Sequence, residues 1–569
     1  MLIVDKTTIA EYLIENIKDF PKFGDQTLEN YIEIPPLEIN YTYAYPCYNL
    51  AKSRKKDPKL ISKDLEKELT VPDYLDEIKA LGPYLNFRVK SEITLGNILN
   101  LQENYGIIRG KVDPERIVIE YPSPNTNKPL HLGHVRNMLI GSTLSNIFKY
   151  QGHNVFQVNL NNDRGIHICK SMVAYKKWGK SAEPNKKPDH FVGDFYVKYS
   201  QMEQKNDKLA DEVKNLLKLW EKEDKETRAL WKKMNNWALD GFKETYNKFG
   251  ISFDKEYNES EFYWKGKDKI IEGVNKGIFE KGTDGAIIAK FDDYGSLPEK
   301  VLLRSDGTSI YITQDIYLAY LKKKDFIYDR SIYIVGNEQD LYFQQLFAVL
   351  DMIGFKEEKF HLSYGMISLP EGKMKSREGT IVDADDIIQE IENLAFIEVD
   401  KRYPEIAEEE KSYRAKIIGD AALRFFILKY NPKSDFIFNP KESLSFEGET
   451  GPYIQYCYAR IQSIIDKSKE KIDLDIDFRL LIHEKEIKLM KQLNIFPEIV
   501  DITQRIYGIH LIPQYLLTLC QLFNSFYSDC KVISENKELE KARLLLIKCV
   551  QIVVKIGLNL LGIDTLEEM

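Results

Sequence analysis

The stretch from residue 116 to residue 134 constrains the fold of this chain more than any other. Residues 116–121 read RIVIEY, an apolar run typical of a β-strand, and lead into a loop rich in Pro, Asn and Ser. A helix then starts at His131-Leu132-Gly133-His134. Small residues let the backbone approach a phosphate group, and the N-terminus of a helix offers unpaired N–H groups to an anion. The sequence therefore predicts a strand–loop–helix unit that binds a nucleotide.

Two histidines lie in the first turn of that helix. His131 and His134 are three residues apart, so their imidazoles face the same way and both could reach one polyphosphate. The same pattern also fits two histidines that only cap and cover the start of a helix. Taken alone, the four-residue pattern leaves both interpretations open.

Composition and cysteine spacing exclude several classes of protein. A chain of 569 residues with 43% hydrophobic and 30% charged residues is globular, and we expect about three or four domains. It has no apolar run of 18 residues, and its start carries an Asp and no small-residue cleavage site, so we expect neither a membrane span nor a secretory signal. Six cysteines without a CxxC pair indicate a reducing cytoplasm, no disulfide framework and no zinc site. The net charge of −8 neither predicts nor excludes a nucleic-acid partner.

Strand and helix patterns change along the chain. Alternating strands and helices around residues 117–160 and 331–353 predict a parallel sheet with crossover helices. The Lys/Glu/Trp-rich stretch of about 180–260 is expected to be a helical insertion whose charges lie on solvated faces, and we assign it no chemistry. From about residue 390 onward the sequence predicts helices and no further strands.

A second motif lies between the sheet pattern and the helical tail. Residues 372–380 read GKMKSREGT, a loop of Lys, Arg, Ser and Gly that can close over a triphosphate and neutralise charge as pyrophosphate leaves. Basic surface loops are common, so this motif gains its meaning from its place after the HLGH turn. In this order, the two motifs resemble the HIGH and KMSKS signatures of class I aminoacyl-tRNA synthetases.

Several separated segments resemble one family of that class, the arginyl-tRNA synthetases. They are EYPSPNTNKPLHLGHVRN, VNLNNDRGIHI, DGTSIYITQDI, YIVGNEQDL, GKMKSREGT, FEGETGPYIQYCYARIQSII and RLLLIKCVQIVVKIGLNLLGI, and they extend over nearly the whole chain. The resemblance implies an arginine–tRNA ligase. Such an enzyme activates L-arginine with ATP to arginyl-adenylate, releases pyrophosphate, and transfers the arginyl group to the 3′ end of tRNA(Arg) with release of AMP.

The resemblance also implies the architecture. We expect an α/β fold in which a Rossmann-like, doubly wound parallel-sheet catalytic domain lies between an N-terminal α+β domain and a C-terminal all-helical bundle. The predicted boundaries are 1–112 for the N-terminal tRNA-binding domain, 113–390 for the catalytic domain with its insertion, 391–450 for a helical connector, and 451–569 for a DALR-type anticodon-binding domain.

The activation step is assigned to residues in both motifs. By resemblance, His131 and His134 stabilise the pentavalent phosphate, and Gly133 binds ATP beside them. The residues of the second motif that we expect at the ATP site are Lys373, Met374, Lys375, Ser376 and Arg377.

One position departs from the general class I pattern. Ser376 stands at the fourth position of the KMSKS-like sequence, where a catalytic Lys is usual. Many arginyl enzymes carry a Lys three residues before the first HIGH histidine instead, and here that residue is Lys128. The transition state needs a cation near the α-phosphate, and either loop could deliver it. We favour Lys128, and a direct role for Lys375 stays open.

The arginine pocket is predicted from a pair of residues and their chemistry. Tyr311 and Asp315 are four residues apart, so on a helix their side chains project together. Arginine carries a planar, permanent cation whose receptor needs carboxylates and hydroxyls, and by resemblance this pair binds the guanidinium. Taken alone, Asp315 is also explained as a residue that caps or solvates a helix. The other residues expected around the amino acid are Glu120, Ser123, Pro124, Asn125, His134 and Gln339.

Contacts with tRNA are expected in two places. Tyr453, Gln455, Tyr456 and Arg460 combine stacking surfaces with hydrogen-bond donors, as unpaired bases require. Taken alone, such aromatic residues on a helix more often belong to a core. Tyr84 and Asn86 are the expected contacts in the N-terminal segment, which resembles the family's domain for the outer corner of the tRNA.

Two other functions remain as alternatives. A class I synthetase for cysteine would need thiolate zinc ligands beside the HIGH-like helix, which the scattered cysteines do not supply. A synthetase-derived RNA-binding protein without catalysis would have no reason to keep both histidines, Lys128 and Asp315 together. We expect ATP with Mg²⁺ as a substrate, no tightly bound cofactor or metal, and a monomer in the cytoplasm whose partners are tRNA(Arg), L-arginine and ATP.

Overall fold

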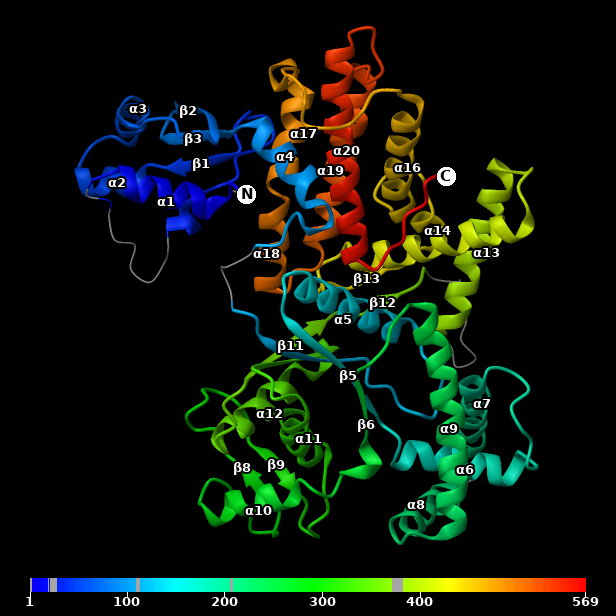
Figure 1. Ribbon diagram of the computed structural model, residues 1–569. Coiled ribbons are helices and arrows are strands. Elements are labelled where there is room, and N and C mark those ends of the chain that lie inside the picture. The colour runs from blue at the N-terminus through cyan, green and yellow to red at the C-terminus, as the bar shows by residue number, and fades with distance from the viewer. Residues whose placement is uncertain (1–2, 19, 21–27, 109–112, 205–207, 371–381) are drawn as a thin grey trace. The chain divides into compact units, whose positions relative to one another are not determined.

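The computed structural model describes residues 3–18, 20, 28–108, 113–204, 208–370 and 382–569 (Figure 1). The chain forms two compact units. The sheet unit comprises residues 112–406 and 426–443, and the bundle unit comprises residues 1–111, 407–425 and 444–569.

A five-stranded parallel sheet forms the centre of the sheet unit. Its strand order is β11-β10-β4-β5-β6, and every pairing between neighbours is parallel. The chain therefore leaves β4 in one direction toward β5, and a later segment adds β10 and β11 on the other side. Ligands of such sheets bind at the carboxyl ends of the strands where the order reverses, here at the ends of β4 and β10. The strands are β4 (Arg116–Glu120), β5 (Asn154–Asn161), β6 (Lys255–Asn258), β10 (Arg330–Gly336) and β11 (Glu358–Tyr364).

Helices cover both faces of this sheet. Figure 1 shows α5 (Leu132–Tyr150) on one face, and α11 (Tyr311–Phe326) and α12 (Asp340–Met352) on the other. Val118 of β4 belongs to a buried apolar cluster with Ile316 and Leu346, which lie on those last two helices. The expected Rossmann-like, doubly wound arrangement is confirmed.

The remaining elements of the sheet unit include α7, α8 and α9, which lie within the stretch of about 180–260 expected to be an insertion, and α6, which precedes it. Tyr175, Phe191 and Trp237 form edge-on ring contacts that hold α6, α7 and α9 together. These elements are α6 (Ile166–Trp178), α7 (Pro188–Glu203), α8 (Lys208–Glu221), α9 (Lys225–Lys248), α10 (Lys267–Asn275), β7 (Glu280–Lys281), β8 (Ile287–Ala289), β9 (Lys300–Leu303), β12 (Ile367–Ser368), α13 (Ala384–Arg402), β13 (Phe436–Ile437) and α15 (Pro440–Ser443).

The expectation that strands end near residue 390 is wrong at one point. Strand β13 pairs in parallel with β12, which precedes it by some 70 residues of chain. Arg136 supports this junction, because its buried guanidinium donates hydrogen bonds to the carbonyl groups of Gly365, Pro432 and Ser434. A two-residue strand is too short to show a period-2 pattern, so its sequence carries no strand signal.

The bundle unit contains a small antiparallel sheet and a group of long helices. Its strands are in the order β1-β3-β2, and α3 packs on β2 and β3, whereas α4 packs on α17 and α20. Most of α20 is buried among the other C-terminal helices. The expected N-terminal α+β domain and C-terminal helical bundle are confirmed. The elements are α1 (Lys6–Asn16), β1 (Tyr43–Pro46), α2 (Tyr48–Arg54), α3 (Pro58–Glu68), β2 (Leu75–Leu81), β3 (Tyr84–Val89), α4 (Ser91–Leu101), α14 (Glu408–Leu428), α16 (Gly451–Lys467), α17 (Glu484–Asn494), α18 (Phe496–Ile506), α19 (Leu511–Asp529) and α20 (Lys537–Leu560).

Among the described residues, none of the helices combines the length and the apolar character needed to cross a membrane.

Candidate active site

The two histidines lie in the first turn of α5 and are joined by a hydrogen bond. His131 is the N-cap residue, and its Nδ1 accepts a hydrogen bond from the backbone N–H of Gly133 at 3.1 Å. The Nδ1 of His134 accepts from the backbone N–H of His131, also at 3.1 Å. The two rings lie with their centroids 3.8 Å apart. Capping of the helix is therefore real, and both rings still face the same way.

These hydrogen bonds determine where the imidazole protons lie. A neutral imidazole with an accepting Nδ1 carries its proton on Nε2. Burial lowers the pKa of His131 to about 4, and burial together with the neighbouring ring lowers the pKa of His134 well below its ordinary range. The positive charge of the Lys128 ammonium also lowers the pKa of both rings. At neutral pH the turn therefore presents two uncharged Nε2–H donors.

The loop between β4 and α5 is held by side chains at the end of β5. The backbone N–H of Ser123 donates to Oδ1 of Asn159 at 3.2 Å, and its carbonyl accepts from Nδ2 of Asn162 at 3.0 Å. Asn125 forms a parallel bridge with Asn162. Pro124, which lies between Ser123 and Asn125, is buried. Asn159 and Asn162 lie in a segment that carried the resemblance, but no chemical pattern singled them out.

Asp315 and Tyr311 lie in the first turns of α11, as expected. Tyr311 is 67% exposed. One carboxylate oxygen of Asp315, Oδ2, accepts a hydrogen bond from the hydroxyl of Tyr342 on α12. Burial raises the pKa of Asp315 to about 7, and the negative charge of Glu120 adds to the increase, while the Tyr342 hydrogen bond and the Lys322 ammonium oppose it.

Glu120 joins this group from the end of β4. Its Oε2 accepts a hydrogen bond from Nζ of Lys322 at 2.8 Å, and the ammonium lies 3.8 Å above the ring of Tyr333. Lys322 is fully buried, and it is on the same helix as Asp315. Two carboxylates and one ammonium leave one negative charge when all are ionised. This charge matches a single guanidinium cation.

Gln339 lies at the same end of the sheet. It ends the short 3₁₀ helix Asn337–Gln339 that follows β10, and its side chain is exposed.

Two residues near Asp315 were missed by the sequence analysis. Tyr342 lies three residues after Gln339, near the start of α12. A hydroxyl group at this position, soon after the end of β10, was the sequence signal that could have indicated it. Glu259 is buried, and its pKa rises to about 8 because burial outweighs the attraction of Arg164. Its carboxylate lies 3.6 Å from the Arg164 guanidinium. Glu259 is far from Asp315 in the sequence, so no local sequence pattern linked the two residues.

The second motif falls outside the described residues. Lys373, Met374, Lys375, Ser376 and Arg377 all belong to that segment. Their roles, and the choice between Lys128 and Lys375, stay predictions.

The four expected tRNA contacts of α16 differ in their surroundings. The Arg460 guanidinium lies 4.7 Å over the ring of Tyr456 and donates to its hydroxyl, and both side chains are partly exposed. The Tyr453 hydroxyl accepts from Asn524 at 2.8 Å. Gln455 is fully buried, and its amide donates to the carbonyl of Asp564 at 2.7 Å. We therefore leave Gln455 out of the proposed RNA contacts.

The N-terminal pair also separates into a surface residue and a buried one. The ring of Tyr84 lies edge-on to Tyr48, which is 52% exposed. Asn86 is 2% exposed, and its amide donates to the carbonyls of Lys79 and Tyr84. Asn86 thus supports the β2–β3 hairpin from inside, whereas Tyr84 and Tyr48 offer an aromatic surface.

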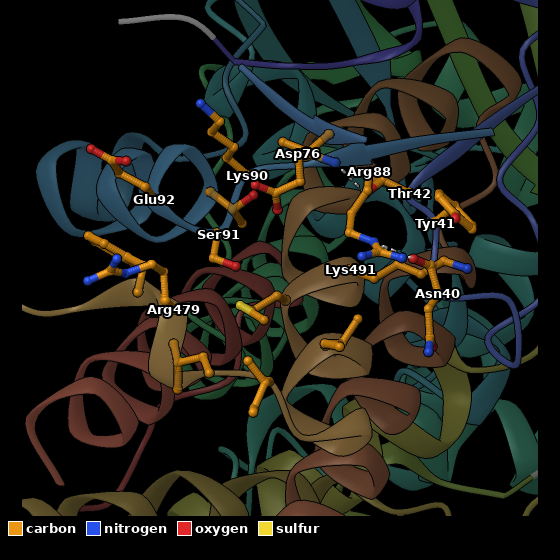
Figure 2. A pocket seen from close by; sticks show the side chains of 17 residues that line it. Asn40, Tyr41, Thr42, Asp76, Arg88, Lys90, Ser91, Glu92, Arg479 and Lys491 are labelled. Atoms are coloured by element: carbon orange, nitrogen blue, oxygen red, sulfur yellow. Dashed lines mark hydrogen bonds between the residues drawn. The ribbon is translucent and has the colours of Figure 1, made fainter. Parts of the chain in front are cut away.

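A pocket of about 560 Å³ lies in the bundle unit, between the small sheet, α4 and the start of α17 (Figure 2). Two of its basic residues, Arg88 and Lys491, already have partners. Arg88 is 3.2 Å from the Glu77 carboxylate, and the Lys491 ammonium donates to the carbonyls of Pro35, Pro36 and Ile39. We assign this pocket no ligand.

Comparisons with known proteins identify the family. The family described as tRNA synthetases class I (R), catalytic domain, matches residues 94–440. The chain belongs to the arginyl-tRNA synthetase family. The family's N-terminal domain matches residues 7–89, and the DALR anticodon binding domain matches residues 454–569.

Individual relatives within the arginyl-tRNA synthetase family match nine tenths of the chain or more. An arginine–tRNA ligase from Treponema denticola is 44% identical, with 99% of each chain covered. One from Parabacteroides distasonis is also 44% identical, with 90% of this chain and 91% of the relative covered. The structure of the arginyl-tRNA synthetase from Thermus thermophilus has a TM-score of 0.82 at 25% identity, with 99% of each chain covered. The resemblance found in the sequence is confirmed, and it favours arginine over the cysteine alternative.

Proposed function

We propose that this protein is an arginine–tRNA ligase. It activates L-arginine with ATP to arginyl-adenylate and pyrophosphate, and it then transfers the arginyl group to the 3′ end of tRNA(Arg) with release of AMP. The observation that carries the proposal is the grouping of Glu120 and Asp315 at the end of β4, from which the loop leads directly to His131 and His134. The residues that would bind the planar cation and the residues that would bind phosphate thus lie at the same end of the sheet.

The activation step uses positioning and electrostatics, and no covalent enzyme intermediate is needed. The arginine carboxylate attacks the α-phosphate of ATP, which enters with Mg²⁺ as part of the substrate. The Nε2–H groups of His131 and His134 donate to the phosphate oxygens as negative charge develops there. Lys128 supplies a positive charge beside them, and residues 373–377 neutralise the leaving pyrophosphate.

Recognition of arginine rests on charge and shape. Asp315 and Glu120 accept N–H groups of the guanidinium, and the exposed Tyr311 covers it. Ser123, Asn125 and Gln339 lie around the α-amino and carboxylate groups. Lysine lacks the planar set of donors and leaves buried acceptors unpaired, so we expect rejection by a factor of roughly 10⁴.

Binding of tRNA uses the bundle unit. Tyr453, Tyr456 and Arg460 on α16 offer rings and donors to unpaired bases, and Tyr84 with Tyr48 offers a second aromatic surface. The proposal further includes a monomer in the cytoplasm. All six cysteines are buried and free, as a reducing compartment would leave them.

The direct test is ATP–pyrophosphate exchange with the purified protein, measured with arginine, lysine and cysteine and with or without tRNA(Arg). Exchange that depends on arginine alone among the three amino acids is the expected result. Exchange with cysteine would identify the cysteine alternative. No exchange with any of them in the presence of tRNA would indicate an RNA-binding protein without catalysis.

Arginine binding should depend on pH through Asp315. Burial raises the pKa of this carboxyl group to about 7, and the group must be ionised to pair with a guanidinium. We therefore expect the Kd for arginine to rise about tenfold for each pH unit below 7 and to level off above it. Titration calorimetry in buffers of different ionisation enthalpy would also detect the proton released on binding. A Kd for arginine that is constant between pH 5.5 and pH 8 would show that Asp315 does not pair with the guanidinium.

A further inference from the structure

A cluster of charged groups lies at the start of α13. The Oδ2 of Asp385 accepts hydrogen bonds from Nζ of Lys187 at 2.6 Å and from Nε2 of His190 at 2.9 Å, and its Oδ1 accepts from Nζ of Lys248 at 3.0 Å. Lys187 also donates to the fully buried carboxylate of Asp189 at 3.1 Å. The partners of Asp385 come from the N-terminus of α7 and the end of α9, so the cluster connects the helical insertion with α13.

The cluster is built from ion pairs and does not resemble a metal site. Asp189, His190 and Asp385 have the composition of a ligand set, and their ligand atoms lie within 4.8 Å of one another. The Lys187 ammonium, however, bonds to both carboxylates, where a metal ion would have to bind. The hydrogen bonds from His190 and Lys187 outweigh burial and keep the pKa of Asp385 below its ordinary range.

The chain just before Asp385 is paired with the turn that carries the first histidine. The backbone N–H of Leu132 donates to the carbonyl of Val382 at 2.9 Å, and the N–H of Ala384 donates to the carbonyl of Leu130 at 3.0 Å. His131 and Asp383 form the antiparallel bridge between these two bonds. Any movement of residues 382–384 is therefore transmitted to His131.

Helix α7 also touches the loop that carries the proposed catalytic lysine. At Gly193, a Cβ atom would lie 2.6 Å from Cδ of Pro129 and 3.6 Å from Cα of Lys128. Only a glycine allows this approach without a shift of the loop. The same helix thus supports Lys128 directly and His131 through Asp385.

We propose that α7 and Asp385 position the phosphate-binding residues of the active site: the ion pairs of Lys187, His190 and Lys248 with Asp385 hold residues 382–384 against His131, and Gly193 seats the loop that carries Lys128. The inference rests on the proposed roles of His131 and Lys128 in adenylate formation. It assigns a task to the helical insertion, for which the sequence analysis expected only solvated charges.

The test is Asp385→Asn, with Asp386→Asn as the matched control on the exposed side of the same turn. We expect kcat for arginyl-adenylate formation to fall by about 10²-fold in Asp385→Asn, since a displacement of about 1 Å costs that much. KM for arginine should change less than threefold, because the guanidinium receptor is on other elements. Asp385→Glu should recover part of the lost rate, and Asp386→Asn should match the wild type.

A second pair of variants tests the contact of α7 with the loop. Gly193→Ala should also lower kcat for arginyl-adenylate formation with little change in KM for arginine. Gly96→Ala is the control, since a Cβ atom there would lie at an ordinary 3.9 Å from its nearest neighbour. Circular dichroism and thermal unfolding report whether each variant is folded. If Asp385→Asn and Gly193→Ala are folded and keep the wild-type kcat, the inference is overturned and the proposed function stands. A wild type without arginine-dependent exchange would overturn both.

Discussion

Replacing Asp315 by asparagine should abolish useful arginine binding while the protein stays folded. The substitution keeps the size of the side chain and an oxygen that can accept from Tyr342, but it removes the negative charge that we propose pairs with the guanidinium. Loss of one partner of a buried charged pair costs several kcal/mol. We therefore expect Kd for arginine to rise by about 10³-fold, which corresponds to about 4 kcal/mol. Titration calorimetry and the KM for arginine in pyrophosphate exchange measure this change.

A matched control is available on the next helix. Asp351 lies at the end of α12, is about half exposed, and pairs with Lys359 at 2.7 Å. Exposed pairs of this kind contribute little, so Asp351→Asn should leave arginine binding within twofold of the wild type. Near-normal arginine affinity in Asp315→Asn would contradict the proposed pocket.

The same substitution should not destabilise the protein at pH 8. The folded-state pKa of Asp315 is raised to about 7, so the folded protein binds the proton more tightly than the unfolded chain does. Stability contributed by this group is therefore lost as pH rises from the unfolded pKa of about 4 to the folded pKa of about 7. Asparagine lacks this cost, and we expect Tm at pH 8 to be equal to or above that of the wild type. A loss of arginine affinity with an unchanged or higher Tm separates a binding role from a structural one.

Two replacements of His134 should separate its catalytic role from its capping role. Asparagine can place an acceptor where Nδ1 accepts from His131, but it does not reach the position of Nε2. Glutamine reaches that outer position with an N–H donor but does not reproduce the cap. If His134 donates to the phosphate, His134→Asn should lower adenylate formation by about 10² to 10³-fold, and His134→Gln should keep more activity.

Single-turnover formation of arginyl-adenylate measures this step without the later transfer to tRNA. If capping were the only role, the order of the two variants would be reversed, with asparagine close to the wild type and glutamine impaired. A change below threefold in both variants would mean that the ring contributes nothing to the chemistry. Thermal unfolding provides the control, since loss of an N-terminal cap costs about 1 kcal/mol.

The parts of the fold that the sequence predicted are those with local signals. The run from Arg116 to Tyr121, the small residues of the loop and the helix that starts after His131 are each readable within a few residues. The parallel sheet follows from the alternation of such units. Tyr311 and Asp315 were readable as a pair, because a helix brings residues four apart to the same side.

The parts that the sequence could not predict depend on contacts between distant segments. Tyr342 reaches Asp315, and Lys322 reaches Glu120, only because β10 pairs with β4 and α11 packs on both. Gln455 and Asn86 have the chemistry of RNA contacts, yet both are buried. Burial depends on which neighbouring elements cover a helix or strand, and a single helix or hairpin sequence does not contain that information.

The order of strands in the sheet has a consequence for biosynthesis. Glu120 and Lys322 are 202 residues apart in the chain, and β10 follows Lys322 by only a few residues. A ribosome-bound chain that has emerged only as far as α9 carries the histidine turn but lacks α11 with Asp315 and Lys322. The long closure required to add β10 beside β4 is slow compared with local helix formation. Until this closure occurs, one side of β4 is an open hydrogen-bonding edge, and the incomplete sheet is exposed to wrong pairings for that interval.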